Sequence, residues 1–483
     1  MKISLALLIT LLIYSSNSFS LPIDWQGEIT FDHHYLSNAR FIQETGNGTG
    51  NIGSTEVLKN GFNENEASFQ SYIFKLSPTI IVSDSVILKG EISNGLARGG
   101  RLGDDSANNF GTETNPGRYY NNTPAGTNQL NLNQLYARIY GTTATYEIGR
   151  HPIHWGLGAL VNNGSESQSR FSTIRDGITA KVKLGKFSIE PFIARSFSSD
   201  SLSSESNQSE IGGTLLFNSI ESEMKLGVYY SSITTGENES QRRADTNNTG
   251  STTPFNEGKI KVTDFYFEKS YKNINLKIEV PILSGTIGNV FQNSQSSNID
   301  SKGMIAQLVY THNDQWLLKS TIGNVNGEDG TAGSFEGLSL HPNFQVSNIM
   351  FNYNRAAVWD TNENIFDSSI TNSTFLDLDL IHKSNQSTWI LGFTYAVANE
   401  AAKAGSSAYN HLTGKTFSAA FDQDESLGLE VDLDYEYQLS EETLIDLSLA
   451  YFSPGDFYAY TNTATVVTPE SSYLFKFGTT IRF

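Results

Sequence analysis

The chain has 483 residues, no cysteine, and 51 acidic against 32 basic side chains, which give a formal net charge of −19. This acidic excess argues against nucleic acid or anionic lipid as a binding partner, because both would be repelled. The lack of cysteine excludes a disulfide scaffold, and no stretch after residue 20 approaches the roughly 18 apolar residues of a transmembrane helix.

The first 20 residues have the pattern of a secretory signal peptide. Lys2 precedes an apolar run at 3–14, and the small residues Ser18 and Ser20 follow it. We therefore expect residues 1–20 to be removed, so that the mature chain begins at Leu21 and its net charge becomes −20 with the loss of Lys2. No proline-rich or Lys/Glu-rich linker interrupts the remainder, which predicts one domain over residues 21–483.

Alternation with a period of two is the dominant pattern of the mature chain, and it is typical of strands with one apolar and one polar face. Leu429 and Val431 share one face of such a segment, while Glu430 and Asp432 share the other. A strand with this pattern can separate lipid from water. We predict 18 of these strands. They lie near residues 24–34, 68–82, 85–94, 130–140, 143–150, 171–184, 187–198, 208–218, 222–233, 258–270, 274–284, 302–312, 315–324, 374–383, 387–397, 426–438, 442–452 and 472–483.

The connections between these strands are of two kinds. Several are two-residue turns, such as Gly185 with Lys186 and Lys272 with Asn273. Others are long and polar, at 35–67, 95–129, 234–257, 285–301, 325–373, 398–425 and 453–471. Short periplasmic turns and long extracellular loops are typical of bacterial outer-membrane barrels. The fold class predicted is therefore all-β, a transmembrane antiparallel barrel of about 18 strands, with 16 or 20 as alternatives, in the cell outer membrane.

The last strand adds a resemblance. Tyr473, Phe475, Phe477 and Ile481 alternate with polar or small residues, and Phe483 ends the chain. This segment resembles the C-terminal signature by which outer-membrane barrels are recognised by the barrel assembly machinery. The resemblance implies that Phe483 is part of an assembly signal and that this machinery is a partner.

A barrel of this width cannot be filled by its own wall side chains, so a water-filled channel is expected. The first strand begins soon after the expected cleavage site, which leaves no room for an N-terminal plug, so loops are expected to narrow the lumen. The connection 325–373 is long enough to fold inward as a constriction. Alternatively, 335–341 and 345–355 form one more hairpin, which would raise the count to 20.

Strand parity assigns a set of charged side chains to the lumen. We predict that an acidic arc near the closing seam faces a basic group across the lumen and produces a transverse field; the alternative is that these are solvated residues without a selective role. The acidic arc is Glu28, Asp32, Asp377, Asp379, Glu430, Asp432, Asp434, Glu436 and Asp446, and the basic group is Arg138, Arg175, Lys181 and Lys183.

The segment 144–160 runs from a strand through Gly149 and Arg150 into a glycine-rich turn. It is similar to the strand-end Gly-Arg-Gln pattern of alginate-export and other substrate-specific porins, with His151 in place of the glutamine. The resemblance implies that the arginine points into the pore. Because Arg150 falls on the lipid-side parity of Ile148, an inward position needs a bulge at Gly149; the alternative is a loop-anchoring salt bridge.

Other signals do not indicate a cofactor or a metal. His151 and His154 have metal-ligand spacing but no third ligand in view. Asp360 begins a segment that resembles a calcium loop, but Ile365 stands where that loop requires glycine. No nucleophile elbow, phosphate-binding loop or dinucleotide fingerprint is present.

These patterns favour a non-enzymatic porin for passive diffusion of small hydrophilic solutes or ions, as a homotrimer or a monomer embedded in outer-membrane lipid. The first alternative is a substrate-specific porin for export or uptake of a saccharide of the alginate type. The second is a surface receptor or adhesin with a closed lumen. An outer-membrane enzyme would need a histidine beside serine or aspartate at the outer rim, near which His33 and His34 are expected.

Overall fold

The computed structural model describes residues 22–39, 41, 66–94, 98–101, 130–197, 207–235, 258–288, 290–291, 296–331, 333–354, 365–411, 414–460, 462 and 468–483. The expected signal peptide at 1–20 lies outside these residues, as does Asp360 of the calcium-like segment.

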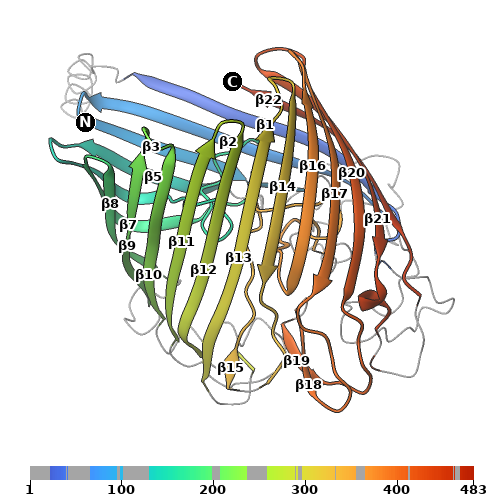
Figure 1. Ribbon diagram of the computed structural model, residues 1–483. Coiled ribbons are helices and arrows are strands. Elements are labelled where there is room, and N and C mark those ends of the chain that lie inside the picture. Colours follow the sequence, from blue (N-terminus) through green and yellow to red (C-terminus); the bar gives the residue numbers. More distant parts are fainter. Residues whose placement is uncertain are drawn as a thin grey trace, which may run out of the picture.

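Eighteen long antiparallel strands form one closed barrel (Figure 1). Each pairs with its neighbours along the chain, and β1 also pairs with β22, which closes the ring. Closure leaves no unpaired strand edge in a membrane, where lipid offers backbone groups no hydrogen bonds. The barrel strands are β1 (Ile23–Leu36), β2 (Ala67–Ser83), β3 (Val86–Asn94), β5 (Leu130–Tyr140), β6 (Ala144–Pro152), β7 (Ile174–Leu184), β8 (Phe187–Phe197), β9 (Asn207–Ser219), β10 (Met224–Thr235), β11 (Gly258–Tyr271), β12 (Ile274–Gly288), β13 (Ser297–Thr311), β14 (Trp316–Val325), β16 (Ser373–Lys383), β17 (Ser387–Ala398), β20 (Ser426–Gln438), β21 (Thr443–Pro454) and β22 (Ser472–Arg482).

The predicted fold class and the count of 18 are confirmed. The largest differences in strand ends lie where the ladder continues beyond the apolar pattern. β12 extends to Gly288 rather than 284, and β13 begins at Ser297 rather than 302. The added residues are mostly glycine and polar residues, so they pair through their backbones without the apolar alternation that made the strands recognisable.

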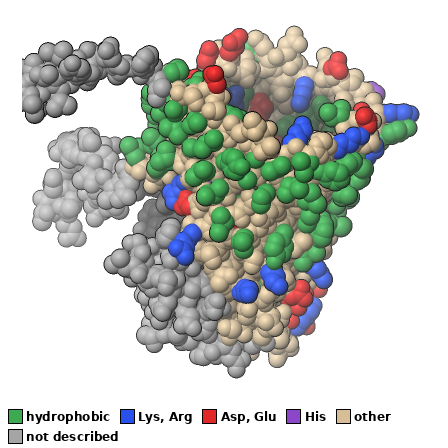
Figure 2. Space-filling model, turned by 90° about the vertical axis from the view of Figure 1, so that its left-hand side faces the viewer, with side chains coloured by type: hydrophobic (Ala, Val, Ile, Leu, Met, Phe, Trp, Pro, Cys, Tyr) green, Lys and Arg blue, Asp and Glu red, His purple; other side chains and the backbone are tan. Residues whose placement is uncertain are grey.

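The outer surface is an apolar belt (Figure 2). Trp25, Ile193 and Leu391 on three different strands are each 50–59% exposed. The polar residues that alternate with such apolar residues along each strand face inward. Figure 2 shows hydrophobic side chains across the middle of the barrel wall and charged ones gathered toward its two ends. A continuous belt of this kind is stable against lipid and would aggregate in water. The protein therefore sits in the outer membrane.

The two ends of the barrel differ as predicted, with tight turns at one end and loops at the other. β1 begins and β22 ends at the turn end (Figure 1). At the loop end, β18 (Ser407–Asn410) and β19 (Lys415–Ser418) form a separate hairpin, and the 3-10 turn η4 (Asp456–Ala459) follows β21. In the part of the chain that the structure describes, no helix is long and apolar enough to cross a membrane.

Two further short strands lie against the barrel wall. β4 (Gly99–Arg101) pairs with β2, and β15 (Ser334–Phe335) pairs in parallel with β13. The additional hairpin considered for 335–341 and 345–355 is not formed, so the 20-strand barrel is wrong. The alternating residues Ile349, Phe351 and Tyr353 are all buried, because they form the core of a loop inside the barrel rather than a strand in its wall.

Candidate functional site: the narrowed lumen

Two loops fold into the barrel and meet there. The first inward loop is residues 153–173, between β6 and β7; the second is the described part of the connection between β14 and β16, residues 326–331, 333–354 and 365–372. The backbone N–H of His341 donates to the carbonyl of Ala159 at 2.7 Å. The Asn343 side chain accepts from the backbone N–H of Phe171 at 3.1 Å and donates to its carbonyl at 2.7 Å. The two loops therefore form one connected structure inside the lumen, and the constriction considered for 325–373 is present.

A strand carboxylate holds the tip of the second inward loop. Glu430 on β20 accepts hydrogen bonds from the backbone N–H groups of Asn348, Ile349 and Met350 at 2.8, 2.6 and 2.8 Å. Thr394 on β17 donates to the carbonyl oxygen of residue 346 at 2.8 Å. An ionised carboxylate makes stronger hydrogen bonds to N–H groups than a neutral acceptor does, so Glu430 fixes this segment against the wall.

Two more carboxylates hold the first inward loop at opposite ends. Glu279 on β12 accepts from the backbone N–H groups of Leu157 and Leu160. Glu28 on β1 accepts from the N–H of Gln168 and the hydroxyl of Ser167, both at 3.0 Å. β12 and β1 lie on different sides of the barrel, so the loop crosses the lumen between them.

Two buried arginines complete the support of the loops. Arg98 is paired with Glu91 at 2.6 Å and donates to three carbonyl oxygens of the first inward loop. Arg170 lies 3.7 Å above the ring of Phe366 and donates to the hydroxyl of Ser71 at 2.9 Å. Burial lowers the pKa of Arg170 to about 10, so its guanidinium remains charged at neutral pH.

The predicted basic group lies on the lumen side of β5 and β7, and three of its four cations form ion pairs on the same wall, with two carboxylates between them. Arg138 and Lys181 both pair with Glu147, at 2.6 and 3.0 Å. Arg175 pairs with Glu210 at 3.0 Å. Lys183 lies near the turn end and makes no ion pair with any described residue.

The predicted acidic arc lies on β1, β16, β20 and β21, and it is only partly neutralised. Among the residues that the structure describes, four of its members have a basic partner. These pairs are Glu28 with Lys75, Asp32 with Arg170, Asp379 with Lys319 and Asp446 with Lys476. The other members have no such ion pair within the described chain; they are Asp377, Glu430, Asp432, Asp434 and Glu436. A transverse field between arc and group stays a prediction.

Arg150 lies on the outer face of β6, not in the lumen. Gly149 has a φ of 123°, yet the pairing register of β6 with both neighbours continues through it without a shift. Ile148 is exposed outside and His151 is buried inside. The Arg150 guanidinium pairs with Asp176 of β7 at 2.7 and 2.8 Å. The prediction of a pore-lining Arg150 is wrong, because positive φ at a glycine does not insert the extra residue that reverses the alternation.

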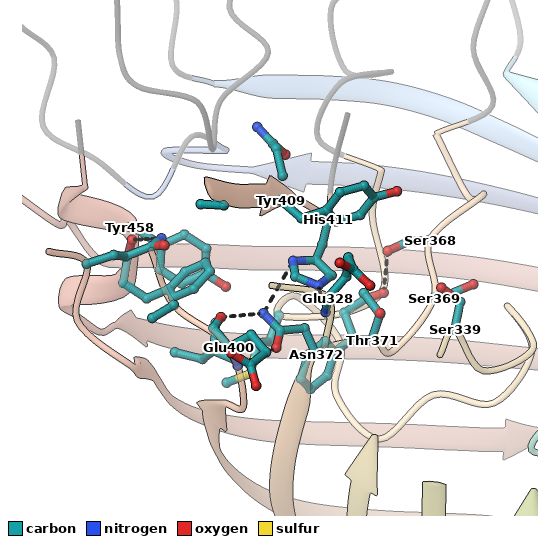
Figure 3. Close-up of a pocket in the computed structure, with 18 of the residues that line it drawn as sticks. Glu328, Ser339, Ser368, Ser369, Thr371, Asn372, Glu400, Tyr409, His411 and Tyr458 are labelled. Carbon is teal, nitrogen blue, oxygen red and sulfur yellow. Dashed lines mark hydrogen bonds between the residues drawn. The ribbon is translucent and has the colours of Figure 1, made fainter. Parts of the chain in front are cut away.

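The loop end holds a pocket of about 280 Å³ between the second inward loop, the β18–β19 hairpin and η4 (Figure 3). His411 accepts a hydrogen bond at Nε2 from the backbone N–H of Glu328 at 2.7 Å, and burial lowers the pKa of His411 to about 4. Burial and the nearby carboxylates of Asp329 and Glu336 raise the pKa of Glu400. Among the described residues, no lysine or arginine lines this vestibule pocket.

A second cavity of about 230 Å³ lies in the lumen below the loops, between them and β1. Asp32, His34 and Lys476 face it, but the arrangement does not resemble a hydrolytic site. His34 contacts the Ser71 hydroxyl at 3.0 Å, and that hydroxyl donates to Asp32. In a catalytic triad the carboxylate instead accepts from the histidine and orients it. Ser71 is fully buried in the wall, so a substrate has no access to its hydroxyl.

The described residues contain no group of three or more side chains that could hold a metal ion. The Nε2 of His151 lies 2.8 Å from the hydroxyl of Thr179, which gives this buried histidine a structural role.

Sequence reasoning missed five side chains that shape the lumen. Glu147, Glu210 and Glu279 are on inward parity in recognisable strands, so parity could have found them. Arg98 and Arg170 lie outside the barrel strands, where no periodic pattern indicates direction.

No protein-family model and no curated protein sequence matches this chain. Solved structures of similar shape include two proteins of Pseudomonas aeruginosa. OccK9 (OpdG) has 9% identity and a TM-score of 0.49, and OccK1 (OpdK) has 10% identity and a TM-score of 0.46; in both cases 95% of this chain and 98% of the other is covered. A loop L8 deletion mutant of OmpT, an outer membrane protein of Vibrio cholerae, has 10% identity and a TM-score of 0.37, with 96% and 99% covered. At this identity the likeness concerns the barrel architecture alone.

Proposed function

We propose that the protein is an outer-membrane channel through which small hydrophilic solutes diffuse. The observation that supports this most directly is the polar, charged interior of a barrel whose exterior is apolar. A barrel of 18 strands is too wide for its wall side chains to fill, so water occupies the space that the loops leave.

The inward loops favour a selective channel over a general one. They are tied to the wall at Glu28, Glu279 and Glu430 and to each other at Asn343. A lumen crossed by fixed loops excludes solutes by size and by contact, whereas an open barrel excludes them by size alone. This supports the substrate-specific alternative without identifying an alginate-type saccharide, since the arginine of that resemblance lies outside the pore.

The test is electrical recording of the purified protein in planar bilayers, combined with swelling of liposomes in sugars of increasing size. We expect discrete conductance steps and swelling restricted to small solutes. Unrelated sugars entering strictly by size would favour a general porin. If neither conductance nor swelling is detected, the channel proposal is overturned and a surface receptor barrel is favoured.

The terminal residue also supports assembly in the outer membrane. The backbone of Phe483 exchanges hydrogen bonds with Gly27 of β1, at 2.7 and 3.1 Å, and its ring covers the space where a Gly27 Cβ would lie. Recognition of this strand by the barrel assembly machinery is tested by deleting Phe483 and measuring the amount of folded protein in outer-membrane fractions. We expect a reduced amount; an unchanged amount would contradict the assembly role.

A further inference from the structure

The vestibule pocket at the loop end is a cavity that passive diffusion does not by itself require. It lies between the second inward loop, the β18–β19 hairpin and η4, and its volume is about 280 Å³. Pockets that bury drug-sized molecules measure about 300–1,000 Å³, so this pocket has room for a somewhat smaller solute.

The ring hydrogen of His411, which lines this pocket, can be assigned from its hydrogen bonds. Burial lowers the pKa of His411 to about 4, so the ring is neutral at pH 7 and carries a single N–H. Its Nε2 accepts from the backbone N–H of Glu328 at 2.7 Å, so Nε2 carries no hydrogen. The hydrogen therefore lies on Nδ1, and Nδ1 is a donor.

The side-chain amide of Asn372, also in the pocket lining, has a fixed orientation. Its Oδ1 accepts from the backbone N–H of Glu400 at 2.7 Å, and its Nδ2 donates to the carbonyl of the same residue at 2.8 Å. Exchanging the amide oxygen and nitrogen would break both bonds. Nδ2 therefore lies 3.4 Å from His411 Nδ1 with a second hydrogen that has no acceptor among the described residues.

Two donors without an acceptor thus lie next to each other in the pocket lining (Figure 3). Neither nitrogen can accept from the other, because both carry hydrogens. Buried donors without an acceptor cost free energy. An oxygen atom about 2.9 Å from each nitrogen would satisfy both, so this part of the pocket favours a ligand oxygen.

The charges of the lining decide which kind of ligand can supply that oxygen. Carboxylates line the pocket, whereas no lysine or arginine of the described chain does. The carboxylates belong to Glu328, Asp329, Asp367 and Glu400. Lys403, which follows Glu400 closely in the sequence, pairs with Glu425 instead. An anion would be repelled, and a simple cation has no lone pair to offer the two donors.

A neutral polyhydroxylated solute meets both requirements. Each hydroxyl donates one hydrogen bond and accepts others, so it can accept from His411 and Asn372 and donate to the carboxylates. Met350, Phe351 and Phe457 also line the pocket and offer apolar contact to the C–H groups of a sugar ring. A lining that is partly apolar with a few placed polar groups is typical of small-molecule sites.

We propose that the vestibule pocket binds a neutral monosaccharide, with one sugar oxygen between His411 Nδ1 and Asn372 Nδ2. This inference rests on the proposed channel function and names its substrate class. The pocket adjoins the constriction, because Met350 lines it and also donates its backbone N–H to Glu430 at 2.8 Å. A bound sugar therefore lies at the extracellular entrance of the narrowed lumen.

Saturation-transfer NMR on the protein in lipid nanodiscs measures binding without requiring conduction. The probes are D-glucose, D-galactose and D-mannose, with D-glucuronate as the anionic counterpart of glucose. We expect a neutral sugar to bind, the epimers to differ because the two donors have fixed positions, and glucuronate to bind more weakly than glucose. In planar bilayers, the sugar that binds should reduce the single-channel current.

The most specific variant is His411→Gln. The glutamine oxygen can still accept from the Glu328 N–H, while the donor at Nδ1 is lost. Loss of one hydrogen bond to the sugar should weaken binding by about tenfold.

A matched pair of variants tests the carboxylates. Glu400→Gln removes a charge from the pocket lining and should reduce the preference for glucose over glucuronate. Glu425→Gln removes the exposed carboxylate that pairs with Lys403 outside the pocket, and should leave binding unchanged.

The outcomes distinguish this inference from the channel proposal. Sugar binding without conductance overturns the channel proposal and leaves the site intact. A conducting protein that binds none of the three neutral sugars overturns the sugar site alone. Binding that His411→Gln leaves unchanged, glucuronate binding equal to that of glucose, or equal effects of Glu400→Gln and Glu425→Gln have the same consequence.

Discussion

Charged residues lie on two walls of the lumen, and their ion pairing differs between the two. On β5 to β9 the cations Arg138, Lys181 and Arg175 each have an ion pair on the same wall, the first two sharing Glu147 and the third pairing with Glu210. On β16 and β20, one ion pair of the described chain, Lys319 with Asp379, serves five inward carboxylates, which are Asp377, Asp379, Glu430, Asp432 and Asp434. A mobile ion responds to the charge that remains after local pairing, because a close ion pair has little field at a distance. The difference teaches that parity identifies lumen charges, whereas pairing decides which of them act on a solute.

The largest expected effect comes from breaking a pair on the compensated wall. Arg175 has a side chain 3% exposed, stacked 3.3 Å above the ring of Phe192, so Glu210→Gln leaves a buried guanidinium without its carboxylate. Loss of one partner of a buried pair lowers the free energy of unfolding by about 3–5 kcal/mol. Urea unfolding in lipid vesicles measures this change. Glu221→Gln, which breaks an exposed pair with Lys186, is the control and should change little; similar effects of the two variants would contradict a role for burial.

The next largest effect is expected on the position of the second inward loop rather than on the stability of the barrel. Glu430→Gln weakens the bonds to three N–H groups of the second inward loop. Burying unsatisfied donors costs about 1–3 kcal/mol, so we expect this segment to leave the wall and single-channel conductance to rise. Thr394→Val removes a single bond to the same segment and should act in the same direction more weakly. Unchanged conductance in both variants would show that this segment does not limit the pore.

Removing a carboxylate from the ion pairs on β5 to β9 should leave uncompensated charge on this wall too, here of positive sign. Glu147→Gln leaves Arg138 and Lys181 without their shared carboxylate, and both side chains are partly open to the lumen. One uncompensated unit charge at a distance on the order of 10 Å in water shifts ion preference by about twofold. The reversal potential in a KCl gradient should therefore move toward Cl⁻. A shift toward K⁺ would contradict the pairing argument.

The stability of the loops that line the vestibule pocket should depend on pH. The pKa of His411 is about 4 in the folded protein, below the usual 6.5, so the unfolded loop binds more protons between these values and the folded loop loses stability as pH falls from 6.5 to 4. Protonation also removes the acceptor that Glu328 N–H uses. Hydrogen exchange at pH 7.5 and pH 5 should show faster exchange of this N–H, after correction for intrinsic rates, at pH 5. His411→Gln should abolish the difference; if it persists, another group is responsible.

The smallest effect is expected outside the lumen. Arg150→Gln breaks the pair with Asp176 on the outer face of β6 and should leave conductance and ion selectivity unchanged. Planar-bilayer recordings test this against Glu147→Gln on the inner face of the same strand. A changed reversal potential in the Arg150 variant would contradict the placement of this side chain outside the pore.

The candidate site could be predicted from the sequence only in part. Parity assigned Asp432 and Arg175 to the inner face of their strands, because neighbouring residues of a strand must face opposite sides, and both side chains are buried. Parity also put Arg150 on the lipid side; the resemblance to a family pattern, which implied an inward arginine and so needed a bulge at Gly149, was wrong there, because the ladder contains no bulge. The approach of Asp379 and Asp432 from either side of Gly392 depends on register across three strands, which one sequence does not encode in any local pattern.

The sequence by itself determined the barrel. Each strand must alternate between lipid and water over its whole length, and each short turn must join strands that pair, so both signals are local and repeat along the chain. Tertiary structure alone decided how the lumen is filled and which charges remain uncompensated. The loop that carries Ile349 alternates like a strand, yet it folds inward because Glu430 and the first inward loop offer it partners from distant parts of the chain. Contacts of that kind depend on the closed ring, and they exist only after the strands have assembled around them.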